Sequence, residues 1–118
     1  MNNFSQKIIV SEKQTAAKLG SGLLPVFSTP ALVALMENTA MQMIELPEGK
    51  SSVGTAISVR HLKASAVGEE ISCTSTLLSR EGNKFSFEIK AFDSKNDLIG
   101  EGTHERYLID IERFMSKL

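Results

Sequence analysis

The chain has 118 residues, of which 42% are hydrophobic, and its 13 basic and 14 acidic side chains give a net charge of −1. This length and apolar content are sufficient for one hydrophobic core, so we expect a single domain over residues 1–118. The balanced charge argues against nucleic acid or a membrane surface as a partner, and the single cysteine, Cys73, excludes an internal disulfide and a CxxC metal site. Without a secretory leader pattern or a long apolar run, the chain is expected to be soluble and cytoplasmic.

A first strand is predicted within residues 6–16, where the run KIIV contains three β-branched residues. Glycines and Pro25 then interrupt the pattern. The clearest boundary follows, because Thr29 is a suitable N-cap and Pro30 suits the first position of a helix. We expect this helix to continue to Leu46, before a proline and a glycine end it.

Glu37 is the most informative residue of the predicted helix. At about 100° per residue, the polar stripe of the helix consists of Asn38, Gln42 and Glu45, and Glu37 lies off this stripe among apolar residues. An ionised carboxylate buried there without partners would be costly, so it requires a counter-charge, hydrogen bonds or local solvent. Carboxylates in such positions are candidates for a functional site.

Beyond Lys50 the residues alternate between apolar and polar types, which is typical of half-buried strands. The pattern predicts four strands, over residues 53–63, 71–80, 84–93 and 97–109. Short, turn-rich joins between the last three strands indicate hairpins, so the strands are expected to be antiparallel. Residues 110–118 are expected to form a short terminal helix capped by Asp110.

A long helix that is apolar around most of its circumference, with one strand before it and four after it, requires a sheet that covers the helix. We therefore predict an α+β hotdog fold, in which a curved antiparallel sheet wraps around a long central helix. The outer strands of such a sheet keep unpaired backbone groups, which pairing with a second copy would satisfy. We expect a homodimer, and the sequence leaves a higher oligomer open.

Three side chains are candidates for chemistry: Thr29 at the helix start, Glu37 just over two turns further on, and His61 on the strand over residues 53–63. Uninterrupted alternation places Thr55 and His61 on one face, and if this face packs on the helix, His61 points toward Glu37. The imidazole would then supply the charge or hydrogen bond that the carboxylate requires. The structural alternatives are a satisfied core histidine, a simple N-cap threonine, and a glutamate that reaches solvent or lines a dimer interface.

Three segments carry a resemblance to a known family. They are FSTPALVALMENTA at residues 27–40, SSVGTAISVRHLKASAVG at 51–68 and GEGTHERYLI at 100–109. The chain resembles the hotdog-fold acyl-CoA thioesterases related to fluoroacetyl-CoA thioesterase, and the resemblance extends over residues 27–115.

The resemblance implies that Thr29, Glu37 and His61 form the catalytic set and that Gly54 lies close to the thioester carbonyl. The expected function is therefore hydrolysis of a small acyl-CoA thioester to the free acid and coenzyme A, with Glu37 as base or nucleophile. No metal and no cofactor is expected. Whether a covalent acyl-enzyme forms stays open.

Arg106 is a further candidate, because alternation places it on the strand face shared with Gly100, Gly102 and His104. Beside a coenzyme A substrate, Arg106 is expected to contact a phosphate or the pantetheine portion, or to brace the site. A salt bridge with an acidic neighbour is the structural alternative. Arg60 and Lys63 flank His61 and are further basic candidates for the nucleotide phosphates, with solvated surface residues as the structural alternative.

Two other functions stay open on the sequence. One is a hotdog dimer that binds acyl-CoA or another apolar ligand without turnover, and the other is a hotdog hydratase or dehydratase. The acyl group itself is not specified, because Phe27 is the only aromatic residue between Phe4 and Phe85 and the aromatic lid of the family cannot be aligned.

Overall fold

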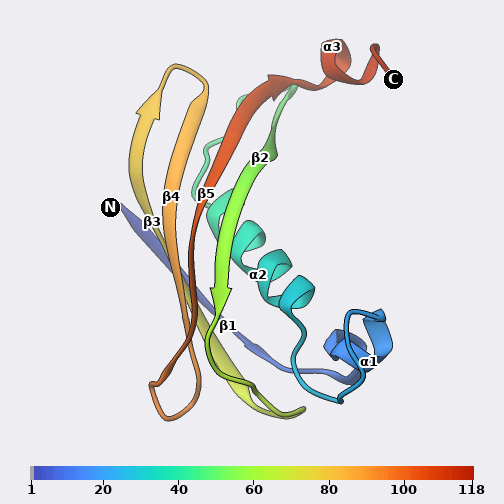
Figure 1. Ribbon diagram of the computed structural model, residues 1–118. Coiled ribbons are helices and arrows are strands. Elements are labelled where there is room, and N and C mark those ends of the chain that lie inside the picture. Colours follow the sequence, from blue (N-terminus) through green and yellow to red (C-terminus); the bar gives the residue numbers. More distant parts are fainter. Residues whose placement is uncertain (1) are drawn as a thin grey trace.

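The computed structural model describes residues 2–118, in which a five-stranded antiparallel sheet curves around one central helix (Figure 1). The strands are β1 (Asn3–Ile9), β2 (Lys50–His61), β3 (Glu70–Glu81), β4 (Lys84–Phe92) and β5 (Leu98–Asp110). The central helix is α2 (Thr29–Met41), and the shorter helical elements are η1 (Glu12–Gln14), α1 (Ala16–Leu19) and α3 (Ile111–Met115). The strand order is β1-β3-β4-β5-β2, so β1 and β2 are the outer strands.

The first strand begins and ends earlier than the prediction over residues 6–16, because it runs from Asn3 to Ile9. Ser11 is then the N-cap of η1, and its N–H donates to the Gln14 side-chain oxygen at 3.0 Å. This local side-chain hydrogen bond offers the backbone an alternative to the sheet and ends the strand.

The N-cap of α2 is Ser28, so the prediction of Thr29 was wrong by one residue. The Ser28 hydroxyl accepts a hydrogen bond from the Ala31 N–H at 3.1 Å, while Thr29 is already the first residue of the helix. Because Ser28 satisfies the first turn, the Thr29 hydroxyl is left available for another partner. The helix ends at Met41 rather than at Leu46, because the chain beyond it closes into tighter turns.

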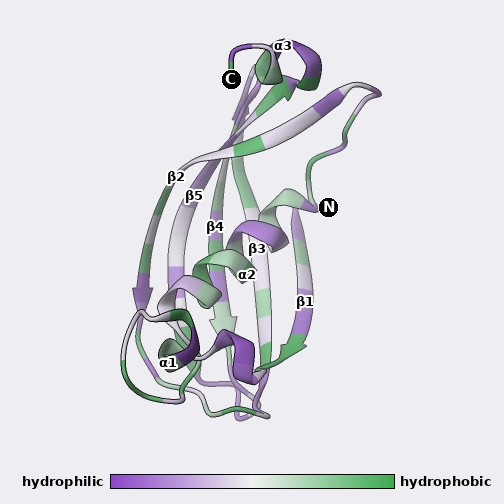
Figure 2. Cartoon of the chain, turned by 90° about the vertical axis from the view of Figure 1, so that its right-hand side faces the viewer, coloured by the Kyte–Doolittle hydropathy of each residue, from purple (hydrophilic) through white to green (hydrophobic). Residues whose placement is uncertain are grey.

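One side of α2 packs across one face of the sheet (Figure 2). The buried helix residues are Ala31, Leu32, Leu35, Met36, Thr39 and Ala40, and they belong to a core with sheet residues that include Ile71, Phe87, Ile89, Ala91 and Ile99. On the other side of the helix, Ala34 and Met41 stay exposed. A single copy therefore covers the helix on one side only, whereas its apolar circumference predicts cover on more than one side.

Two glycines in β5 allow the strand to approach its neighbours closely. A Cβ atom added at Gly100 would lie 2.7 Å from Leu32 Cδ2, and one added at Gly102 would overlap the Ser58 carbonyl oxygen of β2. A side chain at Gly102 would force the neighbouring strand away, and one at Gly100 would require the Leu32 side chain to shift. The close approach holds the following residues of β5 against β2 and α2.

A bulge in β2 changes which residues face the helix. Gly54 pairs with Arg106 and Ala56 pairs with Glu105, so Thr55 is the extra residue of the strand. The predicted uninterrupted alternation was therefore wrong at Thr55, which is exposed and donates to the Glu105 carbonyl at 3.3 Å. In a regular strand, Gly54 and His61 would lie on opposite faces, because they are seven positions apart. The bulge shifts the alternation by one residue, so both face α2.

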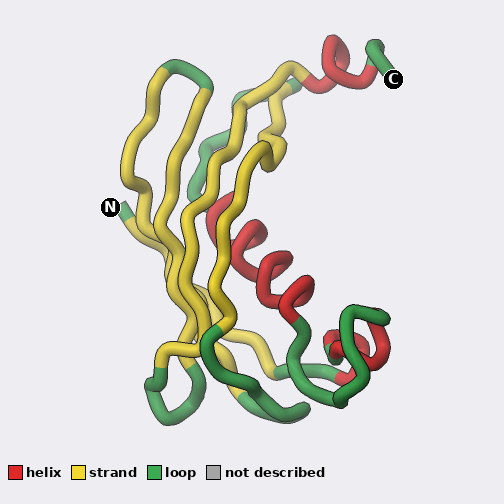
Figure 3. Tube along the Cα trace, viewed as in Figure 1, coloured by secondary structure: helices red, strands yellow, loops and turns green. Residues whose placement is uncertain are grey.

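The loops lie at the two ends of the sheet (Figure 3). α1 and the chain that leads into α2 lie at the end where β2 finishes, while α3 lies at the end where β2 begins. None of the helices in residues 2–118 has the length and apolar character that crossing a membrane requires.

Candidate active site

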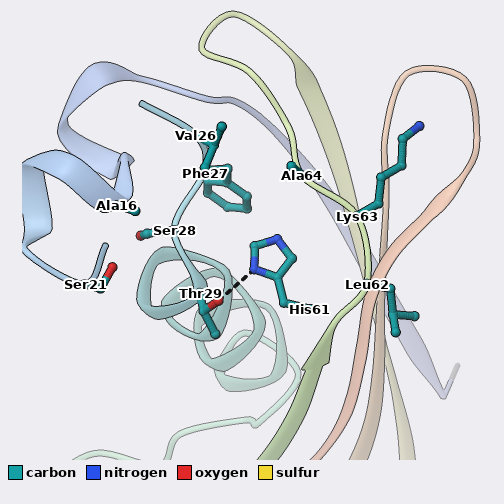
Figure 4. Close-up of a pocket in the computed structure, with 10 residues that line it drawn as sticks. All are labelled: Ala16, Ser21, Val26, Phe27, Ser28, Thr29, His61, Leu62, Lys63 and Ala64. Atoms are coloured by element: carbon teal, nitrogen blue, oxygen red, sulfur yellow. Dashed lines mark hydrogen bonds between the residues drawn. The ribbon is translucent and has the colours of Figure 1, made fainter. Parts of the chain in front are cut away.

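Thr29 and His61 form a hydrogen-bonded pair where α2 begins and β2 ends. The Thr29 hydroxyl oxygen lies 2.8 Å from His61 Nδ1 (Figure 4). This contact uses the hydroxyl that the Ser28 cap leaves available. Because Thr29 is exposed, the pair can be reached from solvent.

His61 lines a pocket of about 310 Å³. The pocket residues are Ala16, Ser21, Val26, Phe27, Ser28, Thr29, His61, Leu62, Lys63 and Ala64. The Phe27 ring contacts the imidazole edge to face, with ring centres 6.3 Å apart. The Lys63 side chain points away from the imidazole (Figure 4). Burial lowers the pKa of His61, which favours the neutral imidazole. Its buried Nε2 has no hydrogen-bond partner among the described residues, so one ring nitrogen is available.

Glu37 belongs to a second cluster, around Gly54. A Cβ atom added at Gly54 would lie 3.0 Å from Glu37 Oε2, 3.1 Å from His104 Cε1 and 3.3 Å from Arg106 Nη1. A carboxylate, an imidazole and a guanidinium group therefore surround the position where Gly54 has no side chain. Gly54 itself is exposed on the outer strand, so this position is accessible.

The predicted pairing of Glu37 with His61 is wrong for a single copy. Within residues 2–118, no hydrogen bond or ion pair joins these two side chains, and His61 is bonded to Thr29 instead. The reason is the geometry of the helix, because the eight residues from Thr29 to Glu37 span about 12 Å along its axis. β2 runs in the opposite sense to α2, so its end meets Thr29 and Gly54 meets Glu37.

Arg106 is buried, with 7% of its surface exposed, and each of its three side-chain nitrogens has a partner. Nε donates to the Ser52 hydroxyl at 2.9 Å, Nη2 donates to the Ser52 carbonyl at 3.1 Å, and Nη1 lies 3.2 Å from His104 Nε2. Burial lowers the pKa of Arg106, and the Glu37 carboxylate acts in the opposite direction. These contacts favour the bracing interpretation of Arg106 over the salt bridge with an acidic neighbour.

Lys63 is occupied elsewhere. Its ammonium group lies 2.5 Å from Asp93 Oδ2 and 2.8 Å from Asp97 Oδ2, and these bonds raise the pKa of Lys63. The ammonium group is therefore directed at the β4–β5 turn rather than at the pocket. These ion pairs argue against the predicted contact of Lys63 with a nucleotide phosphate.

Sequence reasoning missed two residues of the Gly54 cluster, Ser52 and His104. His104 was placed on the same strand face as Arg106 but received no role. Ser52 lies two residues before Gly54, on the same face of β2, which is the signal that would have found it.

Known proteins resemble this chain in sequence and identify its family. Residues 10–112 match the sequence family described as fluoroacetyl-CoA-specific thioesterase. A relative named fluoroacetyl-CoA thioesterase, from Streptantibioticus cattleyicolor, is 39% identical over 95 residues, which cover 79% of this chain and 68% of the relative. The chain belongs to this family of acyl-CoA thioesterases. Its membership confirms the resemblance read from the three sequence segments.

Solved structures give the same assignment of the fold. A structure of the fluoroacetyl-CoA thioesterase FlK has a TM-score of 0.92 at 34% identity, over 98% of this chain and 90% of that one. A thioesterase superfamily member from Thermus thermophilus has a TM-score of 0.90 at 24% identity, over 98% of this chain and 86% of that one. The predicted α+β hotdog fold is confirmed.

Proposed function

We propose that this thioesterase hydrolyses a small acyl-CoA to the free acid and coenzyme A, with Glu37 as general base or nucleophile. The observation that carries the proposal is the convergence of Glu37, His104 and Arg106 on the open position at Gly54. Thioester hydrolysis requires an activated water or a nucleophile, a group that stabilises the oxyanion, and a proton for the leaving thiolate. The names of the relatives support a short acyl group, since they refer to fluoroacetyl-CoA.

The space beside Gly54 suits the thioester carbonyl. It lies within contact distance of the Glu37 carboxylate on one side and of the Arg106 guanidinium on another. A positive charge that is held in place before the reaction stabilises a developing oxyanion without reorganisation. Arg106 is buried and bonded at three nitrogens, so it fits this role better than contact with a nucleotide phosphate at the surface.

The Thr29–His61 pair suits proton transfer to the leaving thiolate. Its neutral imidazole has one nitrogen bonded to the hydroxyl and one nitrogen without a partner. An imidazole in this state can accept a proton at one nitrogen and release one from the other. Thr29 either relays that proton or orients the imidazole through its hydrogen bond.

We also propose that the protein is a homodimer paired through β2, and a higher oligomer stays open. β2 is an outer strand, so its free edge offers unpaired backbone groups to a second copy. Antiparallel pairing of two β2 edges would place the His61 end of one copy beside the Gly54 region of the other. Each site would then combine Thr29 and His61 of one copy with Glu37 and Arg106 of the other.

A thiol-release assay over acetyl-, fluoroacetyl- and medium-chain acyl-CoA tests the reaction. Replacing Glu37 by Gln should lower kcat by about 10²- to 10⁴-fold, because the variant lacks the base or nucleophile. The exposed Glu45 provides the control, and Glu45→Gln should leave the rate unchanged. Full activity of Glu37→Gln would exclude its role. Tight acyl-CoA binding without thiol release would indicate the binding protein, and hydration of crotonyl-CoA would indicate the hydratase.

Mixed dimers test the shared site. Thr29→Ala and Glu37→Gln should each be inactive alone, but a mixed dimer would keep one site with both residues intact. Random mixing should therefore restore about a quarter of the wild-type rate. Mixtures that stay inactive, or light scattering that shows a monomer at micromolar concentration, would contradict the shared site.

A further inference from the structure

His104 is the most buried side chain of the Gly54 cluster, with 2% of its surface exposed. It lies two residues before Arg106 on β5, and the Phe87 ring packs against its imidazole with ring centres 6.3 Å apart. Most buried ring nitrogens have hydrogen-bond partners, and both ring nitrogens of His104 do. The nature of the two partners determines what the residue does.

The two hydrogen bonds define the proton positions on the His104 ring. Nδ1 lies 2.7 Å from the Ala56 carbonyl oxygen, which can only accept, so Nδ1 carries the proton. Nε2 lies 3.2 Å from Arg106 Nη1, which can only donate, so Nε2 accepts. The imidazole is therefore neutral and of one tautomer. Burial is the main cause that lowers the pKa of His104, and the positive charge of Arg106 acts in the same direction.

Both hydrogen-bond partners of His104 lie close to Gly54 in the sheet, one on the same strand and one on the neighbouring strand. Ala56 is the first residue of β2 that returns to regular pairing after the bulge at Thr55, and the bulge is what turns Gly54 toward the helix. Arg106 is the residue that pairs with Gly54 across the two strands. The imidazole thus links the backbone of the bulge to the guanidinium group. Ser52 holds the other two nitrogens of that group.

We propose that His104 is a positioning residue for thioester hydrolysis, which sets the place of the Arg106 guanidinium relative to Glu37 and Gly54 without touching the substrate. This inference rests on the proposed function of the Glu37 cluster. The other charged groups near the ring are Glu37 on α2 and Glu105 and Arg106 on β5. Because Arg106 would act on the oxyanion, displacing it should lower kcat more than it changes KM.

Three substitutions of His104 test its two hydrogen bonds separately. His104→Asn keeps a donor for the Ala56 carbonyl, His104→Gln places an amide oxygen where Nε2 accepts from Arg106, and His104→Leu removes both. We expect kcat to fall about 10- to 100-fold in His104→Leu, with KM changed by less than about threefold, and His104→Gln to recover most of the loss. Thr103→Ala, at the neighbouring exposed position, is the control and should behave as wild type.

Two results would overturn the proposal. One is a rise in KM with kcat unchanged, which would mean that His104 contributes to substrate binding. The other is an equal loss of kcat in the three variants that follows their loss of folding stability in urea, which would mean a purely structural role.

Nitrogen NMR of the protein supplies a readout that requires no activity. In the wild type, His104 should show a protonated Nδ1 and an unprotonated Nε2, and the Arg106 Nε–H signal should exchange slowly with solvent. That signal should broaden in His104→Leu and be retained in His104→Gln. The opposite tautomer, or an imidazolium at neutral pH, would refute the positioning role even in the absence of thiol release, whereas failure of the proposed function alone would leave these signals as expected.

Discussion

The Thr29–His61 pair and the Gly54 cluster lie at two places along the same helix and strand, and their polar atoms are satisfied to different degrees. In the Gly54 cluster, all three Arg106 nitrogens and both His104 nitrogens have partners. In the other pair, Thr29 is exposed and His61 Nε2 has no partner in the described part of the chain. Arg106 and His104 are therefore held in one arrangement by the fold, while the Thr29–His61 pair can still gain a bond.

This difference corresponds to two requirements of thioester hydrolysis. Stabilising a developing oxyanion favours a charge that is fixed beforehand, because reorganising it during the reaction would cost free energy. Transferring a proton requires a group with an available nitrogen or hydroxyl. In the proposed mechanism, the buried guanidinium, which has a partner at each nitrogen, would meet the first requirement, and the partly bonded imidazole would meet the second.

Gly54→Val should produce the largest effect and would break the Gly54 cluster while sparing the Thr29–His61 pair. The added side chain would enter the space that Glu37, His104 and Arg106 surround, so we expect kcat/KM to fall by about 100-fold or more. Thr55→Val, at the exposed bulge residue, is the matched control. Steady-state kinetics measure the effect, and unchanged activity would mean that the reaction does not use this space.

Replacing Ser28 and Thr29 by alanine, one at a time, distinguishes the role of the Thr29–His61 pair from that of the helix cap. Thr29→Ala should lower kcat by about 100-fold with little change in stability, because it removes the bond to His61 but not the helix cap. Ser28→Ala should lower the free energy of unfolding by about 1 kcal/mol, because it removes the cap. Urea denaturation and thiol release together measure both variants. A stability loss in Thr29→Ala that equals the loss in Ser28→Ala would contradict this separation.

The pH dependence of stability should show the smallest effect. The folded protein lowers the pKa of His61 and of His104 below the ordinary value of 6.5, while the unfolded chain keeps that value. Below pH 6.5 the unfolded state binds protons that the folded state does not, so the free energy of unfolding should fall as pH decreases through this range. Urea titrations from pH 8 to pH 5 measure the slope, which His61→Asn should reduce. A stability that rises toward acid would show that the folded state charges these imidazoles.

Much of the fold was predictable from local patterns. The apolar circumference of the helix and the alternation after Lys50 correctly indicated one central helix and four later antiparallel strands. The same alternation correctly placed His104 and Arg106 on one face, because the extra residue of the bulge lies in β2, whereas β5 pairs regularly with β4 over these residues. Regular elements follow from sequence periodicity, which is a local property.

The arrangement of the candidate site was less predictable. Glu37 was singled out as a residue that requires partners near it, but the expected partner, His61, bonds to Thr29 instead in a single copy. The bulge at Thr55 shifts the facing residues of β2 by one, and no local pattern in the sequence marks its position. Likewise, Ser28 and Thr29 are both good N-caps, and only the packed structure decides between them.

The sequence by itself determined that this chain forms a helix with a carboxylate outside its polar stripe, packs this helix against an antiparallel sheet, and belongs among acyl-CoA thioesterases. The tertiary structure alone decided that this carboxylate meets Gly54, His104 and Arg106, and that His61 meets Thr29. The physical reason is that periodicity specifies which face a side chain occupies, whereas the partner on the opposite element depends on strand register, on a one-residue bulge and on the direction of the helix.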